Sequence, residues 1–119
     1  MKKKFKIDNG MEISIVLEID TDKMTSELAK EVNDFWSYAD YVLRASDGCV
    51  FQAVARRAAG PLLGFLMDGY SPTEAVMQLS EQEGWPRDEI GITIIDHEIP
   101  CFDADMYDVT ELDAQEQKP

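Results

Sequence analysis

Positive charge is scarce in this sequence. Eleven lysines and arginines stand against 24 aspartates and glutamates, which gives a formal charge of −13 at neutral pH. From Asp88 to Gln117 there are ten acidic residues and no lysine or arginine. A surface of this charge repels phosphate backbones and anionic lipids, so we expect neither nucleic acid nor a membrane as a direct ligand.

Cysteines and long apolar runs are scarce as well. Cys49 and Cys101 are the only cysteines, and they lack the Cys-x-x-Cys spacing that would indicate a disulfide framework or a zinc site. We expect both to be small buried residues, and a single disulfide bridge between them stays open.

No stretch approaches the roughly 18 apolar residues of a membrane helix. The lysine-rich start is not followed by the apolar core of a signal peptide. The seven glycines match no phosphate-binding loop. We therefore expect a soluble, cytoplasmic protein without a cofactor.

In other respects the composition is that of a globular protein. The chain has 119 residues, of which 45% are hydrophobic, and this is enough for one domain with a modest core. We expect residues 1–113 to form a single α+β domain. Residues 114–119 offer little to bury and are expected to form a frayed acidic tail.

The first half of the chain changes its hydrophobic period once. Alternation of apolar and polar residues over 5–19, interrupted by an Asn-Gly pair, predicts a β-hairpin. A helical stripe follows over 26–45, with Thr25 or Asp22 as its cap and with Phe35 and Trp36 among its core positions.

The second half predicts two more helices and two strands. Asp47 is expected to cap a second helix, in which Gly60 and Pro61 predict a kink or a restart. The segment Ser71-Pro72-Thr73-Glu74 predicts a third helix that opens on a capping box. Period-2 alternation returns over 90–95, as in a central or well-covered strand, and a last short strand is expected over 106–112. The predicted class is α+β, an antiparallel sheet in the order β-β-α-α-α-β-β packed on one helical layer.

Two stretches together resemble a known family. They are "LEIDTDKMTSELAKEVNDFWSYADYVLRASDGCV", residues 17–50, and "EGWPRDEIGITII", residues 83–95. They carry a strand that ends in acid, a helix with an Asn-x-Phe-Trp sequence, an Asp-Gly break, and a Gly-Trp pair before an isoleucine-rich strand. The chain is similar in these features to small bacterial and phage proteins grouped as domain of unknown function 2528. The resemblance implies a fold and a bacterial or mobile-element setting, and it transfers no functional residue.

Reactive residues are better explained by structural roles. His97 precedes Cys101 by four residues, about 13 Å in an extended segment, so we expect a surface or half-buried histidine at a strand end instead of a catalytic pair. Asp103, Asp105, Asp108 and Glu111 have the composition of a calcium loop, but the fifth, sixth and twelfth positions from Asp103 do not fit its template. We expect neither enzymatic activity nor a metal site.

The aromatic cluster at 35–41 has acidic neighbours, which argue against a platform for stacking bases. We expect Phe35 and Trp36 in the core, and Tyr38 and Tyr41 on the opposite face as candidate anchors for a protein partner. The adjacent Arg56 and Arg57 are expected to pair with acids of the protein itself.

Two non-enzymatic functions are consistent with the acidic surface. In the first, the chain is a phage- or plasmid-encoded inhibitor whose carboxylates imitate nucleic-acid charge and block a basic nucleic-acid-binding enzyme of restriction or CRISPR type. That function requires one rigid acidic patch. In the second, acidity only keeps a scaffold or self-associating protein soluble, so a homodimer stays open. The predicted partner-binding residues are Asp96, Glu98, Asp103, Asp105, Tyr107, Asp108, Glu111 and Asp113.

Overall fold

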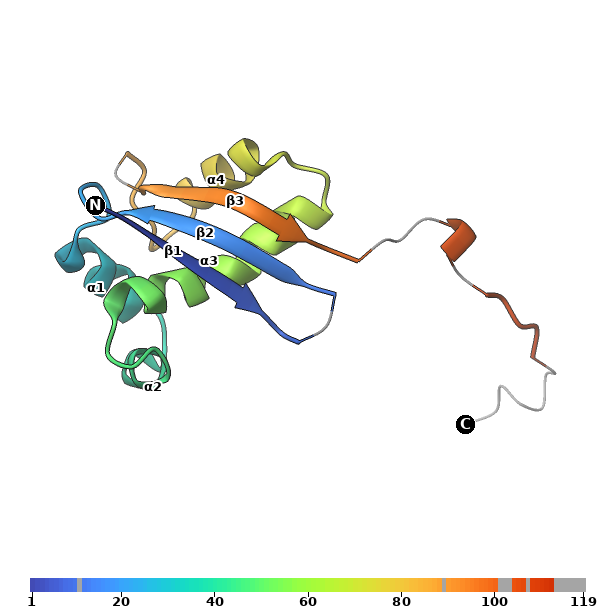
Figure 1. Cartoon of the computed structure of the whole chain (residues 1–119), viewed down its shortest axis with the longest axis horizontal. Helices are drawn as coiled ribbons and strands as arrows, with labels where there is room; N and C mark the ends of the chain where they lie inside the picture. Colours follow the sequence, from blue (N-terminus) through green and yellow to red (C-terminus); the bar gives the residue numbers. More distant parts are fainter. Residues whose placement is uncertain (11, 89, 101–103, 107, 113–119) are drawn as a thin grey trace.

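The computed structural model describes residues 1–10, 12–88, 90–100, 104–106 and 108–112 (Figure 1). In these residues three antiparallel strands form one sheet that packs against α-helices, which confirms the predicted α+β class. The elements in chain order are β1 (Lys2–Asp8), β2 (Ser14–Asp20), α1 (Ser26–Phe35), α2 (Ala39–Ala45), α3 (Val50–Met67), α4 (Pro72–Ser80), β3 (Ile92–Glu98) and the short 3₁₀ helix η1 (Ala104–Met106).

The sheet has the order β1-β2-β3, so β2 is central and β3 lies at an edge. The expectation that the isoleucine-rich strand is central or well covered is therefore wrong. Its inward side chains Ile92 and Ile94 are buried, whereas Ile95 is exposed on the other side. The register shifts between Val16 and Leu17, which pair with Asp96 and Ile94, so Ile95 is the extra residue of a bulge.

The helices cover one face of the sheet and leave the other open (Figure 1). Alternation along β2 explains this arrangement, because every second residue is fully buried while the residues between are only partly covered. The core between sheet and helices contains these β2 residues, the inward face of α3, residues of α1, α4 and β3, and two residues of the connecting segments. Its larger members are Ile15, Leu17, Ile19, Met24, Val32, Val54, Leu62, Leu79, Trp85, Ile92 and Ile94.

Local signals placed two helix starts correctly and one wrongly. The Thr25 hydroxyl accepts a hydrogen bond from the Leu28 amide at 3.3 Å, and Ser71 and Glu74 form both bonds of the predicted capping box. Asp47, the predicted cap of α3, is instead in a left-handed turn at φ 55°. The helix begins two residues later than predicted, with Cys49 as an N-cap residue that makes no side-chain hydrogen bond.

The helix α3 runs through Pro61 without a restart. Ala58 and Leu62 on either side of the proline are fully buried, and we attribute the continuity of the helix to this packing. Gly60 and Pro61 themselves are exposed. The two residues of α3 that are least suited to a helix interior therefore lie on its outward face.

The last predicted strand, over 106–112, is not observed in the part of that span that the structure describes. Met106 ends η1, and residues 108–112 have no regular secondary structure. Their apolar residues Val109 and Leu112 are both exposed, so this segment has no buried face that would hold a strand in register. Tyr107 and the predicted tail at 114–119 lie outside the described residues. No described helix is long and apolar enough to cross a bilayer.

Candidate functional site

Four aromatic side chains gather where the predicted helix over 26–45 divides in two. The helix α1 ends at Phe35, Trp36 is extended, and Tyr38 adopts a left-handed conformation at φ 64° before α2 begins. The expectation that Phe35 and Trp36 are core residues is wrong, because Phe35 is 52% exposed and Trp36 37% exposed. Tyr38 and Tyr41 are exposed, as predicted.

A buried amide explains the break. Asn33 is only 2% exposed, and its Nδ2 donates to the carbonyl oxygen of Ala39 at 3.1 Å. The Arg57 side chain of α3 donates from Nε to Asn33 Oδ1 at 3.1 Å and from Nη2 to the Ser37 carbonyl at 3.0 Å. These bonds satisfy backbone oxygens that a continuous helix would have used. They attach the segment between α1 and α2, which carries the aromatic residues, to α3.

Both adjacent arginines bind neutral oxygens. Arg56 donates from Nε to Ser46 Oγ at 3.1 Å and from Nη2 to the Ala45 carbonyl at 2.9 Å. The ion pairs among the described residues are Met1–Asp22, Lys2–Glu18 and Lys30–Asp34. The expected pairing of Arg56 and Arg57 with acids is thus wrong. Burial lowers the pKa of the Arg57 guanidinium, yet arginine stays charged at neutral pH.

Two surface hollows meet at Arg57. One, of about 260 Å³, lies between Trp36, Pro61 and the buried Trp85. The other, of about 420 Å³, lies between Tyr41, Arg56 and Gly60. Arg57 lines both, so the two hollows are neighbours on one surface. We call it the aromatic–arginine surface and define it by the two hollows together with Phe35, Trp36, Tyr38, Tyr41, Arg56 and Arg57.

The predicted acidic set is spread over two regions. Asp96 and Glu98 pair with Val16 and Ser14, which places them on the open face of the sheet. Asp105 belongs to η1, and Asp108 and Glu111 are exposed beyond it. Figure 1 shows η1 and the following described segment beyond the end of β3, apart from the helices. The remaining predicted residues, Asp103, Tyr107 and Asp113, lie outside the described residues.

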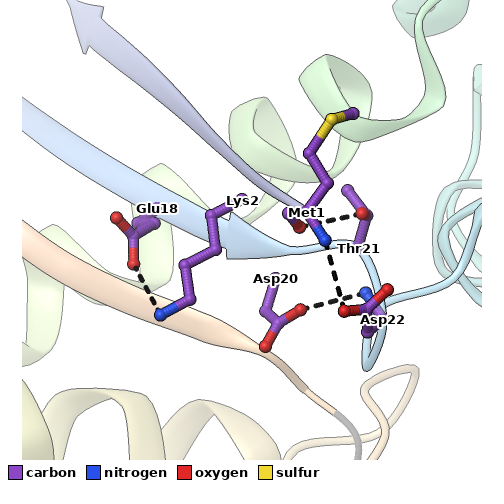
Figure 2. Close-up of polar contacts among 6 residues, drawn as sticks. All are labelled: Met1, Lys2, Glu18, Asp20, Thr21 and Asp22. Atoms are coloured by element: carbon purple, nitrogen blue, oxygen red, sulfur yellow. Dashed lines mark hydrogen bonds and ion pairs between the residues drawn. The ribbon is translucent and has the colours of Figure 1, made fainter.

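Lysines share the open face with the acids. Lys2, Lys4 and Lys6 are exposed on β1, where Lys4 stands opposite Glu18 in the register. Figure 2 shows Lys2 directed toward Glu18, with Nζ and Oε1 3.8 Å apart. At the same end of the sheet the amino terminus lies 3.2 Å from Asp22 Oδ2, and the Thr21 hydroxyl donates to the Met1 carbonyl. This face therefore has mixed charge.

The other candidate residues have ordinary surroundings. His97 is half-buried near the end of β3, as predicted. Cys49 is half-buried, so the expectation that it is a buried residue is wrong. Cys101, and with it the question of a bridge or a Cys-His pair, lies outside the described residues. Within the described ranges, no group of three or more histidine, cysteine or acidic side chains is placed to hold a metal ion.

Sequence reasoning missed the roles of Asn33 and Arg57. The available signal was an asparagine next to Val32 on the buried side of a helix, because a buried amide needs partners for both its donor and its acceptor. An arginine 24 positions away is not a partner that sequence spacing can identify.

Comparison with known proteins places these features in a phage context. The family model described as "Protein of unknown function (DUF2528)" matches residues 14–109. The chain is 32% identical over 112 residues to protein ea10 of Escherichia phage lambda, covering 87% of this chain and 91% of that protein. The same figures hold for a lambda prophage-derived protein ea10 of Escherichia coli O6:H1, strain CFT073. No solved structure matches the chain.

Proposed function

We propose that this chain, which belongs to the DUF2528 family, binds another protein through its aromatic–arginine surface and catalyses no reaction. One observation carries the proposal. Exposed aromatic rings and two guanidinium groups that pair with no carboxylate of the described residues occur together on this surface. Trp36 and Arg57 line one hollow and Tyr41, Arg56 and Arg57 the other. Tyrosine, tryptophan and arginine are the residues that contribute most binding energy at protein interfaces.

Folding alone gives no reason for this surface. Burial of apolar surface stabilises a protein by about 25 cal/mol per Å², and the exposed part of these side chains does not contribute this stabilisation. The exposed Gly60 inside α3 costs roughly 1 kcal/mol relative to alanine. A Cβ atom at Gly60 would meet no atom within 4 Å, so the local structure does not require glycine. A partner that approaches α3 closely would require it.

The surface also indicates the chemistry of the partner. An apolar or aromatic side chain suits the hollow beside Trp36 and Trp85. Carbonyl or carboxylate oxygens suit Arg56 and Arg57, whose described bonds leave other guanidinium donors available. Because the similar proteins come from phage lambda and an Escherichia coli prophage, we infer that the partner is a host or phage protein.

Truncating the aromatic anchors tests the proposal. The partner would be captured from an Escherichia coli lysate, purified, and its dissociation constant measured by biolayer interferometry. Trp36→Ala and Tyr41→Ala are each expected to weaken binding about 30-fold, which corresponds to about 2 kcal/mol for an interface anchor. Val109→Ala, at an apolar residue that is 93% exposed outside this surface, is the matched control and should leave the affinity unchanged.

Gly60→Gln separates binding from stability in the same assay. The new side chain points into open space and into the hollow next to Tyr41. It replaces glycine by a good helix former, so the free energy of unfolding should rise by up to about 1 kcal/mol. Binding should be lost while stability increases. Unchanged affinity in this variant and in both aromatic variants would refute the proposal.

A second candidate function is inhibition by imitation of nucleic-acid charge, and one observation favours it. Asp96, Glu98, Asp105, Asp108 and Glu111 are all exposed, and none of them forms an ion pair with the described residues. Their charge is thus available to a cationic groove such as that of a restriction or CRISPR-type enzyme.

Salt distinguishes the two candidates. If the partner binds the acidic set, its affinity should fall at least about tenfold between roughly 50 and 300 mM NaCl, because exposed charges are screened. The variant Asp96→Asn with Glu98→Gln should then weaken binding, and Gly60→Gln should not. Binding that hardly changes with salt, or capture of the chain's own copies only, would argue against charge imitation and, in the latter case, favour self-association.

A further inference from the structure

The outer edge of β3 has no partner strand among the described residues. Its residues Ile92–Ile94 form a regular ladder with β2 on the inner side, up to the bulge at Ile95. Every second backbone amide and carbonyl of such a strand points away from the sheet. This edge is therefore a template on which an extended segment can pair.

The two edges of the sheet differ in their protection. Natural edge strands carry lysine or proline to prevent pairing. The strand β1 has lysines at positions 2, 3, 4 and 6, whereas in β3 the residues Ile92–Ile94 carry no charge, proline or bulge. The bulge at Ile95 limits pairing beyond it, so the accessible stretch is Ile92–Ile94.

A groove runs beside this stretch. The helix α4 lies along β3 (Figure 1), and the space between them, about 210 Å³, is lined mainly by Pro72, Val76, Met77, Ile92 and Ile94. Met77 is 57% exposed at the groove. Side chains of an added strand that point the same way as Ile92 and Ile94 would enter this groove, and those between them would lie beside Thr93 on the open face.

The surrounding charge selects the occupant. Asp88 precedes β3, and Asp96 and Glu98 belong to it. Lys2 and Lys23 line a hollow with Asp88 at the start of β3, and Arg87 precedes Asp88. At the other end of the strand, Asp96 and Glu98 are exposed and form no ion pair with the described residues. An extended segment with positive charge is attracted to that end, while the edge of a second copy would bring the same acids face to face.

We propose that the groove between α4 and β3 binds an extended basic segment of a partner protein, which adds to the sheet as a fourth strand beside Ile92–Ile94. Its apolar side chains occupy the groove at alternate positions, and its lysines or arginines lie near Asp96 and Glu98. This site is separate from the aromatic–arginine surface and does not depend on the function proposed for it.

The test uses the whole chain and a labelled seven-residue peptide of alternating lysine and valine, with binding followed by fluorescence anisotropy at about 50 mM NaCl, where charge attraction is weakly screened. A glutamate–valine peptide is the charge control. A lysine–valine peptide with N-methyl groups on the amides of one edge is the control for backbone pairing. We expect each control to bind at least about tenfold more weakly than the lysine–valine peptide.

Variants locate the site. Met77→Lys places a cation in the groove at an exposed helical position and should weaken peptide binding at least about tenfold. Gly60→Gln, on the other surface, should leave it unchanged, so failure here is distinguishable from failure of the proposed function. Equal binding of the N-methylated peptide, or of the Met77→Lys variant, would overturn the proposal. So would sedimentation showing a dimer of the chain that Met77→Lys disrupts.

Discussion

Replacing Asn33 by alanine is expected to destabilise the protein by about 2–3 kcal/mol. The amide is buried and makes two hydrogen bonds, one to the Ala39 carbonyl and one from Arg57. Its loss removes one donor from the Ala39 carbonyl and leaves the Arg57 Nε–H without its partner, and an unsatisfied buried polar group costs about 1–3 kcal/mol. The measurement is the free energy of unfolding from urea denaturation, with a constant m-value as the criterion that the transition stays cooperative.

A double-mutant cycle identifies the source of this loss. If Asn33 and Arg57 act together, Asn33→Ala and Arg57→Ala combined should cost at least about 1 kcal/mol less than the sum of the single variants. Arg56 is the matched control, because it binds Ser46 and Ala45 and makes no bond to Asn33. Asn33→Ala and Arg56→Ala should be additive. Additivity in both cycles would show that Asn33 does not hold the helix break through Arg57.

The bonds of Asn33 and Arg57 should also affect the affinity for a partner. The bonds from Asn33 and Arg57 reach Ala39 and Ser37 on either side of Tyr38, so they fix the left-handed turn that directs the aromatic rings outward. Loss of these bonds would let the chain between α1 and α2 sample other conformations. Partner binding through the aromatic–arginine surface would then weaken even though Asn33 touches no partner, because part of the binding energy would order the link.

Features determined by neighbouring residues were predictable from the sequence. The period-2 pattern over 5–19 indicated the β1–β2 hairpin, because alternation places one set of side chains on the covered face. The capping box of α4 was predictable because Ser71 and Glu74 satisfy each other's backbone donors within four residues. The α+β class followed from the order in which these patterns alternate.

Features determined by distant contacts were not predictable. The apolar stripe over 26–45 is compatible with one helix, and the division after Phe35 is stabilised by hydrogen bonds from Asn33 and from Arg57 on α3. Arg56 and Arg57 were expected to pair with carboxylates, but they donate to the carbonyl oxygens of Ala45 and Ser37 near helix ends. The position of β3 at an edge depends on the absence, in the described chain, of a fourth strand that a short apolar pattern had suggested.

Gly84→Ala is expected to cost about 2–4 kcal/mol of stability. Gly84 has φ +87°, a conformation that costs an alanine about 1–2 kcal/mol. An added Cβ would also lie 2.5 Å from Cδ1 of the Phe35 ring, so the ring must leave the position in which it contacts Trp36 edge to face at 4.8 Å between centroids. The change should therefore disturb the aromatic–arginine surface as well as the fold, and thermal unfolding with near-ultraviolet circular dichroism would record both effects.

Two further variants separate the steric part from the backbone part. In a Phe35→Ala background the clash is absent, so Gly84→Ala should cost only the backbone term of about 1–2 kcal/mol. Gly69→Ala has a similar backbone conformation, φ +98°, but its Cβ would meet no atom within 4 Å, so its cost should be the same in the natural chain and in the Phe35→Ala background. If Gly84→Ala were equally costly in both backgrounds, the ring would not rest on Gly84, and the inferred geometry of the aromatic–arginine surface at Phe35 would be wrong.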